Sequence, residues 1–187
     1  MKKLKLAAAL SSALLGLALA SHSFAQEPVV GVADPESLFK DANPALNVNK
    51  QATLHIMREL LQCNHWSDAG NWLTDKYIQH NPNAASGLQG VITYFTMVVK
   101  RPAQNPCDKL TNPVVAVIAQ GDMVLVMTPR VFDDPTKPGQ KYYTTWFDTW
   151  RFVNGKADEH WDGATKAAPP AAAPAAAPAA APAPAKK

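Results

Sequence analysis

Two segments in the first half of the chain repeat their apolar residues at helical spacing. The first lies in "NKQATLHIMRELLQC" and predicts an amphipathic helix over about 49–63. Its apolar face carries Leu54, Met57, Leu60 and Leu61. The second lies in "GLQGVITYFTMVVKR" and predicts a helix that ends before Pro102. Its apolar face carries Leu88, Val91, Ile92, Phe95, Val98 and Val99. Between the two, "SDAGNWLT" predicts a short helix capped by Ser67.

Beyond Asn112 the pattern changes to short β-branched and aromatic runs. These runs are "PVVAVIA", "DMVLVMTPRVF", "YYTTWFDTWRFV" and "KADEHWD", separated by "QGD", "DDPTKPGQ" and "NG". They predict four strands of an antiparallel meander, and the earlier segment "KYIQHNP" is a short extended piece that ends at Pro82. Helices followed by a meander indicate the α+β class.

The last two predicted strands form a hairpin whose register can be predicted. Asn154-Gly155 favours a two-residue type I′ turn, which places Val153 opposite Lys156. The following pairs are then Phe152/Ala157, Arg151/Asp158, Trp150/Glu159 and Thr149/His160. Because side chains alternate between faces, one face is apolar and carries Asp148, Trp150, Phe152, Ala157, Glu159 and Trp161. The opposite face carries His160 and Asp162, and His160 is therefore expected to point away from any interior site.

This register puts two carboxylates, Asp148 and Glu159, among tryptophans. Burial disfavours the charged form of a carboxylate, so such a group can act as a general acid or base near neutral pH. A structural role as hydrogen-bond acceptor for buried donors is the other interpretation. A bulge near Trp150 would shift the register and undo the pairing.

Both ends of the chain differ from the middle. Residues 1–25 combine basic Lys2, Lys3 and Lys5 with a short apolar run and "SHSFA", which predicts a signal peptide cleaved after Ala25. Residues 167–187 are an alanine–proline tract with no core-forming side chains, which predicts a disordered, extended spacer. We therefore expect a periplasmic or secreted protein, with no membrane association after cleavage and one folded domain before residue 167.

Charge and cysteine content narrow the range of partners. The formal charge of +3 becomes about −2 once the signal-peptide and tail lysines are set aside, which argues against a nucleic-acid partner. Cys63 and Cys107 could form a disulfide in an oxidising compartment or remain two free buried thiols. Their spacing matches no zinc motif, and a metal site of His80, His160 and Asp148 would need residues from both hairpin faces. No metal or other cofactor is expected.

Three motifs together resemble a known family. "YIQHNP", "AQGDMVLV" and "FDTWRFVNGKADEHWD" are similar to the SnoaL-like polyketide cyclases of the nuclear transport factor 2-like superfamily. The resemblance runs from about Asn49 to Asp162, so 49–166 is the expected domain and 26–48 an N-terminal extension. It implies a cone in which a curved, mostly antiparallel sheet wraps N-terminal helices around an apolar pocket. It also implies a homodimer formed through the outer sheet face.

The resemblance also implies roles for individual residues. Asp148 matches the acid/base aspartate of the family, and Met127 stands at or near the place of a histidine that relatives often have. His80 is our candidate to replace that histidine, and Glu159 is the second candidate catalytic carboxylate. The expected contacts for a small apolar or aromatic molecule are Tyr77, Trp150, Trp161, Met127 and Phe95.

Three functions are compatible with these residues. The first is a cofactor-independent enzyme of the cyclase, isomerase or aldol-type lyase class, in which Asp148 removes a proton α to a carbonyl. Tyr77 or His80 would then stabilise the enolate oxygen. The second is a non-catalytic module that binds a small molecule in the same pocket. The third is an interaction protein tethered by its tail, because this scaffold hosts enzymes and non-enzymes alike.

Overall fold

The computed structural model describes residues 27–166, and the predicted signal peptide and alanine–proline tail lie outside them. The helical elements are η1 (Pro35–Phe39), α1 (Pro44–His55), η2 (Ile56–Gln62), η3 (Trp66–Asn71), α2 (Leu88–Thr93) and η4 (Tyr94–Val99). The strands are β1 (Leu73–Gln79), β2 (Ala116–Gln120), β3 (Met123–Asp133), β4 (Lys141–Val153) and β5 (Lys156–Trp161). The predicted α+β class is confirmed.

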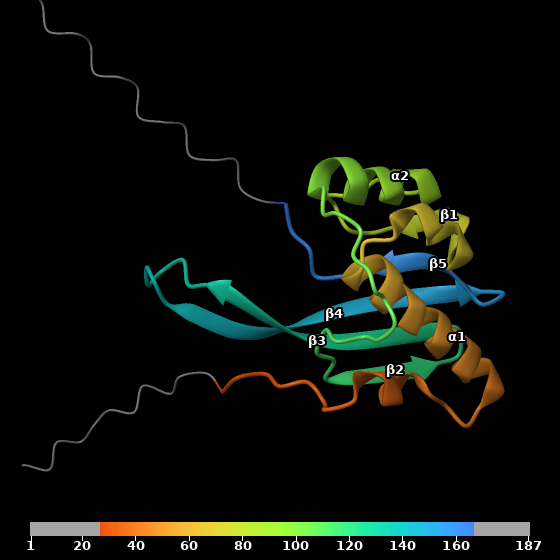
Figure 1. The fold of residues 1–187 in the computed structure, drawn as a ribbon, viewed down its shortest axis with the longest axis horizontal. Coiled ribbons are helices and arrows are strands. Elements are labelled where there is room, and N and C mark those ends of the chain that lie inside the picture. Colours follow the sequence, from red (N-terminus) through yellow and green to blue (C-terminus); the bar gives the residue numbers. More distant parts are fainter. Residues whose placement is uncertain (1–26, 167–187) are drawn as a thin grey trace, which may run out of the picture.

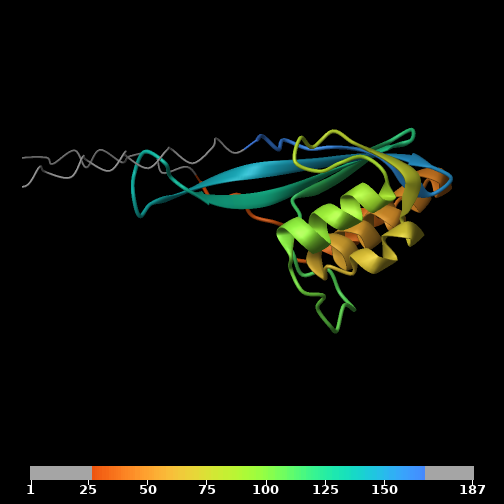
Figure 2. The same ribbon diagram turned by 90° about the horizontal axis from the view of Figure 1, so that it is seen from above.

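The five strands form one mixed sheet in the order β1-β5-β4-β3-β2 (Figure 1). The pairs β2–β3, β3–β4 and β4–β5 are antiparallel, as the meander predicted. The early strand β1 returns to the opposite edge and pairs with β5 in parallel. The helices cover one face of this sheet, as Figure 2 shows. This arrangement agrees with the helix-filled cone that the family resemblance implied.

The first helix begins five residues earlier than the apolar pattern predicted. Asn43 caps it, because its side-chain oxygen accepts hydrogen bonds from the backbone N–H groups of Ala45 and Leu46. Pro44 occupies the first turn, where a missing N–H costs nothing. From Ile56 the helix continues with π-type hydrogen bonding to Gln62. The predicted end of this helix near residue 63 was therefore nearly correct, whereas its predicted start near residue 49 was wrong.

The short second helix is a 3-10 turn, and its predicted cap is wrong. The turn begins at Trp66 after His65, so Ser67 lies inside it and makes no capping bond. Leu73 and Thr74, which we had placed in this helix, already belong to β1. The Trp66 side chain, at the start of the turn, is buried in the core.

The third helix ends before Pro102 as predicted, but its apolar face was only partly correct. Val91 is buried and Phe95 packs on the core, whereas Val98 is 66% exposed. The reason is a change of period: α2 passes into the π-type turn η4, which has more residues per turn than the 3.6 assumed. Val98 therefore rotates away from the predicted face.

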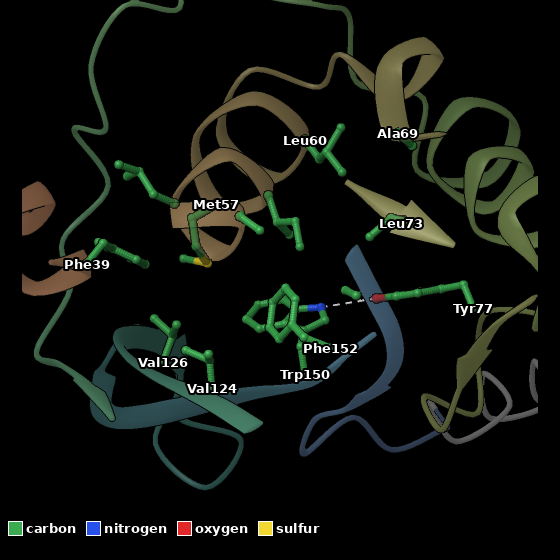
Figure 3. Close-up of a cluster of buried hydrophobic side chains, with 14 of the residues drawn as sticks. Phe39, Met57, Leu60, Ala69, Leu73, Tyr77, Val124, Val126, Trp150 and Phe152 are labelled. Atoms are coloured by element: carbon green, nitrogen blue, oxygen red, sulfur yellow. Dashed lines mark hydrogen bonds between the residues drawn. The ribbon is translucent and has the colours of Figure 1, made fainter. Parts of the chain in front are cut away.

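The core lies between the helices and the covered face of the sheet (Figure 3). Trp150 and Phe152 of β4 lie at its centre, and Met57 and Leu60 cover them from the first helix. Phe39 closes one side. The inward positions of β3 are Val124 and Val126, in alternation with half-buried outward residues. The period-two pattern of this strand was thus predictable.

The β4–β5 hairpin confirms the predicted turn and overturns the predicted register beyond it. Asn154 and Gly155 both have positive φ, and Val153/Lys156 and Phe152/Ala157 pair as expected. A bulge then adds Asp158 as an unpaired residue, so that Arg151 faces Glu159 and Trp150 faces His160. Since one extra residue reverses the alternation, Glu159 and Trp161 move to the outer face and His160 moves inward.

A disulfide joins Cys63, at the end of the first helix, to Cys107 in the loop before β2. It closes 44 residues of sequence, and the two Cα atoms are 6.1 Å apart. Of the two states that the sequence left open, the structure contains the bonded one. No helix within residues 27–166 is both long and apolar enough to cross a membrane.

Candidate active site

A small cavity of about 60 Å³ lies between the helices and the inner face of the sheet. Its apolar walls come mainly from the helices and include Ile56, Leu60, Leu61, Val91 and Phe95. Its polar end comes from β1, β4 and β5 and the residues that follow them, and it includes Gln79, Asn81, Asp148, His160 and Asp162. The cavity therefore offers a dry surface on one side and ionisable groups on the other.

Asp148 and His160 form an acid–base pair at the polar end. His160 Nε2 lies 3.2 Å from Asp148 Oδ1, and each residue is only 6% exposed. The indole N–H of Trp146 donates a further hydrogen bond to Asp148 Oδ1, at 3.2 Å. The β-bulge at Asp158 makes this pairing possible, because without it His160 would face outward.

The neighbours of His160 fix where its protons lie. Gln79 Oε1 accepts a hydrogen bond from the backbone N–H of Asn81 at 3.1 Å, so the oxygen of the amide occupies this position. The same oxygen lies 2.7 Å from His160 Nδ1, which must therefore carry hydrogen and donate it. His160 Nε2 then faces a carboxylate oxygen, and that contact is favourable only if one proton lies between the two atoms. We therefore infer that the pair shares one proton.

Tyr77 supplies a hydroxyl to the same cavity. The indole N–H of Trp150 donates a hydrogen bond to the Tyr77 oxygen at 3.1 Å (Figure 3). Burial raises the pKa of Tyr77 well above its ordinary value, so the phenol stays neutral. Within residues 27–166 the hydroxyl hydrogen has no acceptor among the hydrogen bonds of Tyr77. It is free to bind a ligand oxygen.

Asp162 adds a second carboxylate. Its Oδ2 accepts a hydrogen bond from the Asn81 side chain at 2.7 Å, and its Oδ1 accepts one from the Ala164 backbone at 2.9 Å. Single donor atoms of Asp148, His160 and Asp162 all lie within 4.8 Å of one another, a spacing that could admit a cation. Two inward carboxylates are therefore present as predicted, but the second is Asp162 and not Glu159.

Four predicted site residues line the cavity: Asp148, Tyr77, Trp150 and Phe95. Phe95 also stacks on the Trp66 indole, with ring centroids 3.8 Å apart. Trp66 is a lining residue that the sequence analysis did not select. Met127 is not among the lining residues, because it points to the outer face between the buried Val126 and Thr128.

The other three predicted residues gather on the outer face. His80 Nε2 lies 2.8 Å from Glu159 Oε1, and the His80 ring stacks on Trp161. Arg151 pairs with the other oxygen of Glu159 at 2.8 Å and lies over the Trp161 ring. This outer cluster of His80, Arg151, Glu159 and Trp161 is therefore separate from the cavity. The bulge is again the cause, since it carried Glu159 and Trp161 across the sheet.

The sequence analysis missed His160, Asp162 and Gln79 as site residues. His160 and Asp162 belong to the "EHWD" motif, which was noticed but assigned to the wrong face. Gln79 lies in "YIQHNP", where the sequence analysis selected the adjacent His80 instead. It reaches His160 because β1 and β5 pair in parallel, with Gln79 in register with His160.

Comparisons with known proteins find similarity at the level of fold. No protein-family model and no curated protein match the sequence. A protein described as a SnoaL-like polyketide cyclase from Jannaschia sp. CCS1 is similar in structure, with TM-score 0.45 and 18% identity over 66% of this chain and 91% of the other. A protein described as a polyketide cyclase from Bacillus cereus ATCC 10987 has TM-score 0.45 and 13% identity, over 75% and 87% of the two chains.

A third similar structure is a nuclear transport factor 2-like protein of unknown function from Burkholderia pseudomallei K96243. It has TM-score 0.40 and 18% identity, over 63% of this chain and 91% of the other. Proteins described as SnoaL-like are thus among the solved structures to which this chain is similar.

Proposed function

We propose that this protein is a cofactor-independent acid–base enzyme that removes a proton α to a carbonyl group of a small substrate. The observation that carries the proposal is the contact of 3.2 Å between His160 Nε2 and Asp148 Oδ1 at the wall of an apolar cavity. Buried groups that exchange protons within such a cavity are suited to general acid–base catalysis. Isomerisation, aldol addition and aldol-type cyclisation all begin with this step.

The residues divide the step between them. With the shared proton on His160 Nε2, the Asp148 carboxylate accepts the α-proton of the substrate. The electron pair of the broken C–H bond moves onto the carbonyl oxygen, where the free Tyr77 hydroxyl hydrogen stabilises the enolate. The proton then returns from Asp148 to the same or another carbon, or the enolate attacks an electrophile. His160, held by Gln79, keeps its orientation throughout.

Solvent-exchange NMR tests the proposal without knowledge of the natural substrate. Small ketones and 1,3-dicarbonyls are incubated with the protein in deuterium oxide, and loss of the α-proton signal is followed. We expect exchange that falls at least 100-fold in Asp148→Asn and in His160→Gln, with Glu159→Gln as the matched outer-face control that retains it. Exchange that persists in both cavity variants would refute the assignment.

A binding module without catalysis is the alternative function. The observation in its favour is the size of the cavity, because about 60 Å³ leaves room for only a few water-sized groups. In that case Asp148 orients the ligand and transfers no proton. Saturable ligand binding without exchange in a well-folded protein would favour this alternative.

We propose further that the protein acts outside the cytoplasm, in the periplasm or the extracellular medium. The support is the signal-peptide pattern of residues 1–25, and the Cys63–Cys107 disulfide is compatible with an oxidising compartment. Cell fractionation and the intact mass of the mature chain test this location. A mature chain that still begins at Met1 would contradict it.

We also propose a homodimer formed through the bare face of the sheet. The support is a pair of exposed apolar side chains on the bare face of the neighbouring strands β3 and β4, Val131 and Phe147. Sedimentation tests the proposal, with Phe147→Glu expected to give a monomer and Val48→Glu, on exposed α1 surface, expected to leave the dimer intact. A monomeric wild-type protein would refute it.

A further inference from the structure

The ionisable groups around the cavity are unbalanced in sign. The titratable residues that line it are Tyr77, Tyr94, Asp148, His160 and Asp162, and no lysine or arginine of the described chain is among them. The Asp148–His160 pair with its one proton has no net charge. The phenols are neutral at physiological pH. Asp162 therefore leaves the site with one net negative charge.

The charge of Asp162 is not neutralised by the protein. Its hydrogen-bond partners, Asn81 and Ala164, donate neutral N–H groups, and Asp162 forms no ion pair within residues 27–166. The nearby carboxylates behave differently, because Asp158 pairs with Lys76 and Glu159 with Arg151. A carboxylate in a partly dry site attracts a positive ligand more strongly than it would in water.

The rest of the cavity is suited to the apolar part of an organic ligand. Aliphatic walls and the stacked Trp66–Phe95 pair offer apolar surface, and aromatic faces attract cations. The Trp66 indole N–H is a second observation that points to a ligand, because this donor could pair with an acceptor such as the carbonyl oxygen of the substrate. Trp66 is 4% exposed and lines the cavity, yet its N–H has no hydrogen-bond partner in the described part of the chain. A buried donor of this kind is rarely left unpaired.

We infer that the cavity selects small organic cations, with an ammonium group held between Asp162 and Asp148 and an apolar body against the helices. The inference rests on the proposed function, because it names the substrate class for the same site: small carbonyl compounds that also carry a basic nitrogen. A carboxylate or phosphate ligand is disfavoured, since no lysine or arginine of the described chain lines the cavity and the His160 ring is already paired with Asp148.

Three compounds with one isobutyl body test the inference: isobutylamine, isobutanol and isovalerate. Binding to the full chain is measured by NMR titration at pH 7. We expect the amine to bind at least tenfold more tightly than the alcohol, and isovalerate not to bind measurably. Equal affinity of amine and alcohol, or measurable binding of isovalerate, would overturn the inference. This wild-type comparison needs no variant.

Variants then locate the cation. Asp162→Asn should reduce amine affinity to that of the alcohol, and Asp133→Asn is the matched control because Asp133 is an exposed carboxylate at the end of β3 and lies outside the cavity. Unchanged amine affinity in Asp162→Asn would contradict the assignment. A further experiment measures the binding of zinc and manganese ions to the wild type and to Asp162→Asn, without any organic ligand. Metal binding that is lost in Asp162→Asn, without any amine preference in the wild type, would replace the organic cation with a metal ion.

The binding experiment and the α-proton exchange experiment can fail independently of each other. Amine preference without α-proton exchange would refute the proposed catalysis and keep the ligand class. Exchange of ketone α-protons without any preference for the amine would refute the proposed ligand class and keep the proposed catalysis.

Discussion

His160 Nε2 lies 3.2 Å from Asp148 Oδ1, although the residue in register with His160 across the hairpin is Trp150. The pair is thus diagonal, two residues apart along β4. Diagonal neighbours on one face of antiparallel strands lie within reach of long or aromatic side chains. Gln79 holds the far side of the imidazole at 2.7 Å, so three strands determine the position of one ring.

Replacing Gln79 by leucine should impair the pair without touching Asp148. The His160 Nδ1–H loses its acceptor, and an unsatisfied buried donor costs about 1–3 kcal/mol. We expect the free energy of unfolding to fall by that amount in urea titrations. We also expect α-proton exchange to fall about tenfold or more, because the ring can rotate away from Asp148. Gln120→Leu, at an exposed position of β2, is the control.

If Gln79 served only to fill space, Gln79→Glu would lose as much α-proton exchange as Gln79→Leu. Under our account glutamate still offers an oxygen to His160 Nδ1, so it should restore much of the exchange lost in Gln79→Leu. Failure of glutamate to rescue would count against the positioning role.

Asp158, the bulge residue, should make stability depend on acid pH. The hydrogen bond from the Thr74 hydroxyl, at 2.7 Å, lowers the pKa of Asp158 below its usual value near 3.8, and Lys76 adds to the effect. Because the folded pKa is depressed, the stabilisation is present above the unfolded pKa and is lost as pH falls through the folded one. Stability should therefore decline as the pH drops below about 4.

Thr74→Val removes the main cause of that lowered pKa. Urea titrations at pH 7, 4 and 3 should show the variant weaker by about 1 kcal/mol at pH 7 and closer to wild type at pH 3. An equal difference at every pH would show that Asp158 is not responsible. Thr145→Val, which lies far along β4, is a suitable control.

Removing the disulfide should lower stability by up to about 4 kcal/mol, as loop-closure entropy predicts for a closed segment of this length. The Cys63→Ala, Cys107→Ala double variant, compared with wild type with and without reductant, measures the effect by denaturant unfolding. Reduced wild type and the double variant should agree closely. A double variant as stable as the oxidised protein would contradict the expectation.

The hairpin shows how far the sequence could be interpreted. Asn154-Gly155 encodes the turn locally, so the first two residue pairs were predictable. The bulge is not encoded in the hairpin itself. Asp158 is held by Thr74 and Lys76 of β1, more than 80 residues away, and only the folded sheet brings them together. The wrong face assignments within the hairpin, those of Glu159, His160 and Trp161, follow from this bulge.

The sequence accordingly predicted only part of the candidate site. Asp148, Tyr77 and Trp150 precede the bulge or lie on another strand, and periodicity or the family motif placed them correctly. The helix start was readable in principle, because Asn43-Pro44 is a typical cap, but apolar spacing alone overlooked it. The π-type turns had no such signal, since they change the period that the prediction assumes.

The protonation state of His160 tests the central claim most directly. Nitrogen-15 NMR of histidine-labelled protein distinguishes a protonated ring nitrogen from an unprotonated one, and His160→Gln assigns the signal. We predict that at pH 7 Nδ1 carries hydrogen, and that Asp148→Asn leaves a neutral ring with Nδ1 still protonated. A neutral ring in the wild type with its only proton on Nε2 would contradict the shared proton and the proposal built on it.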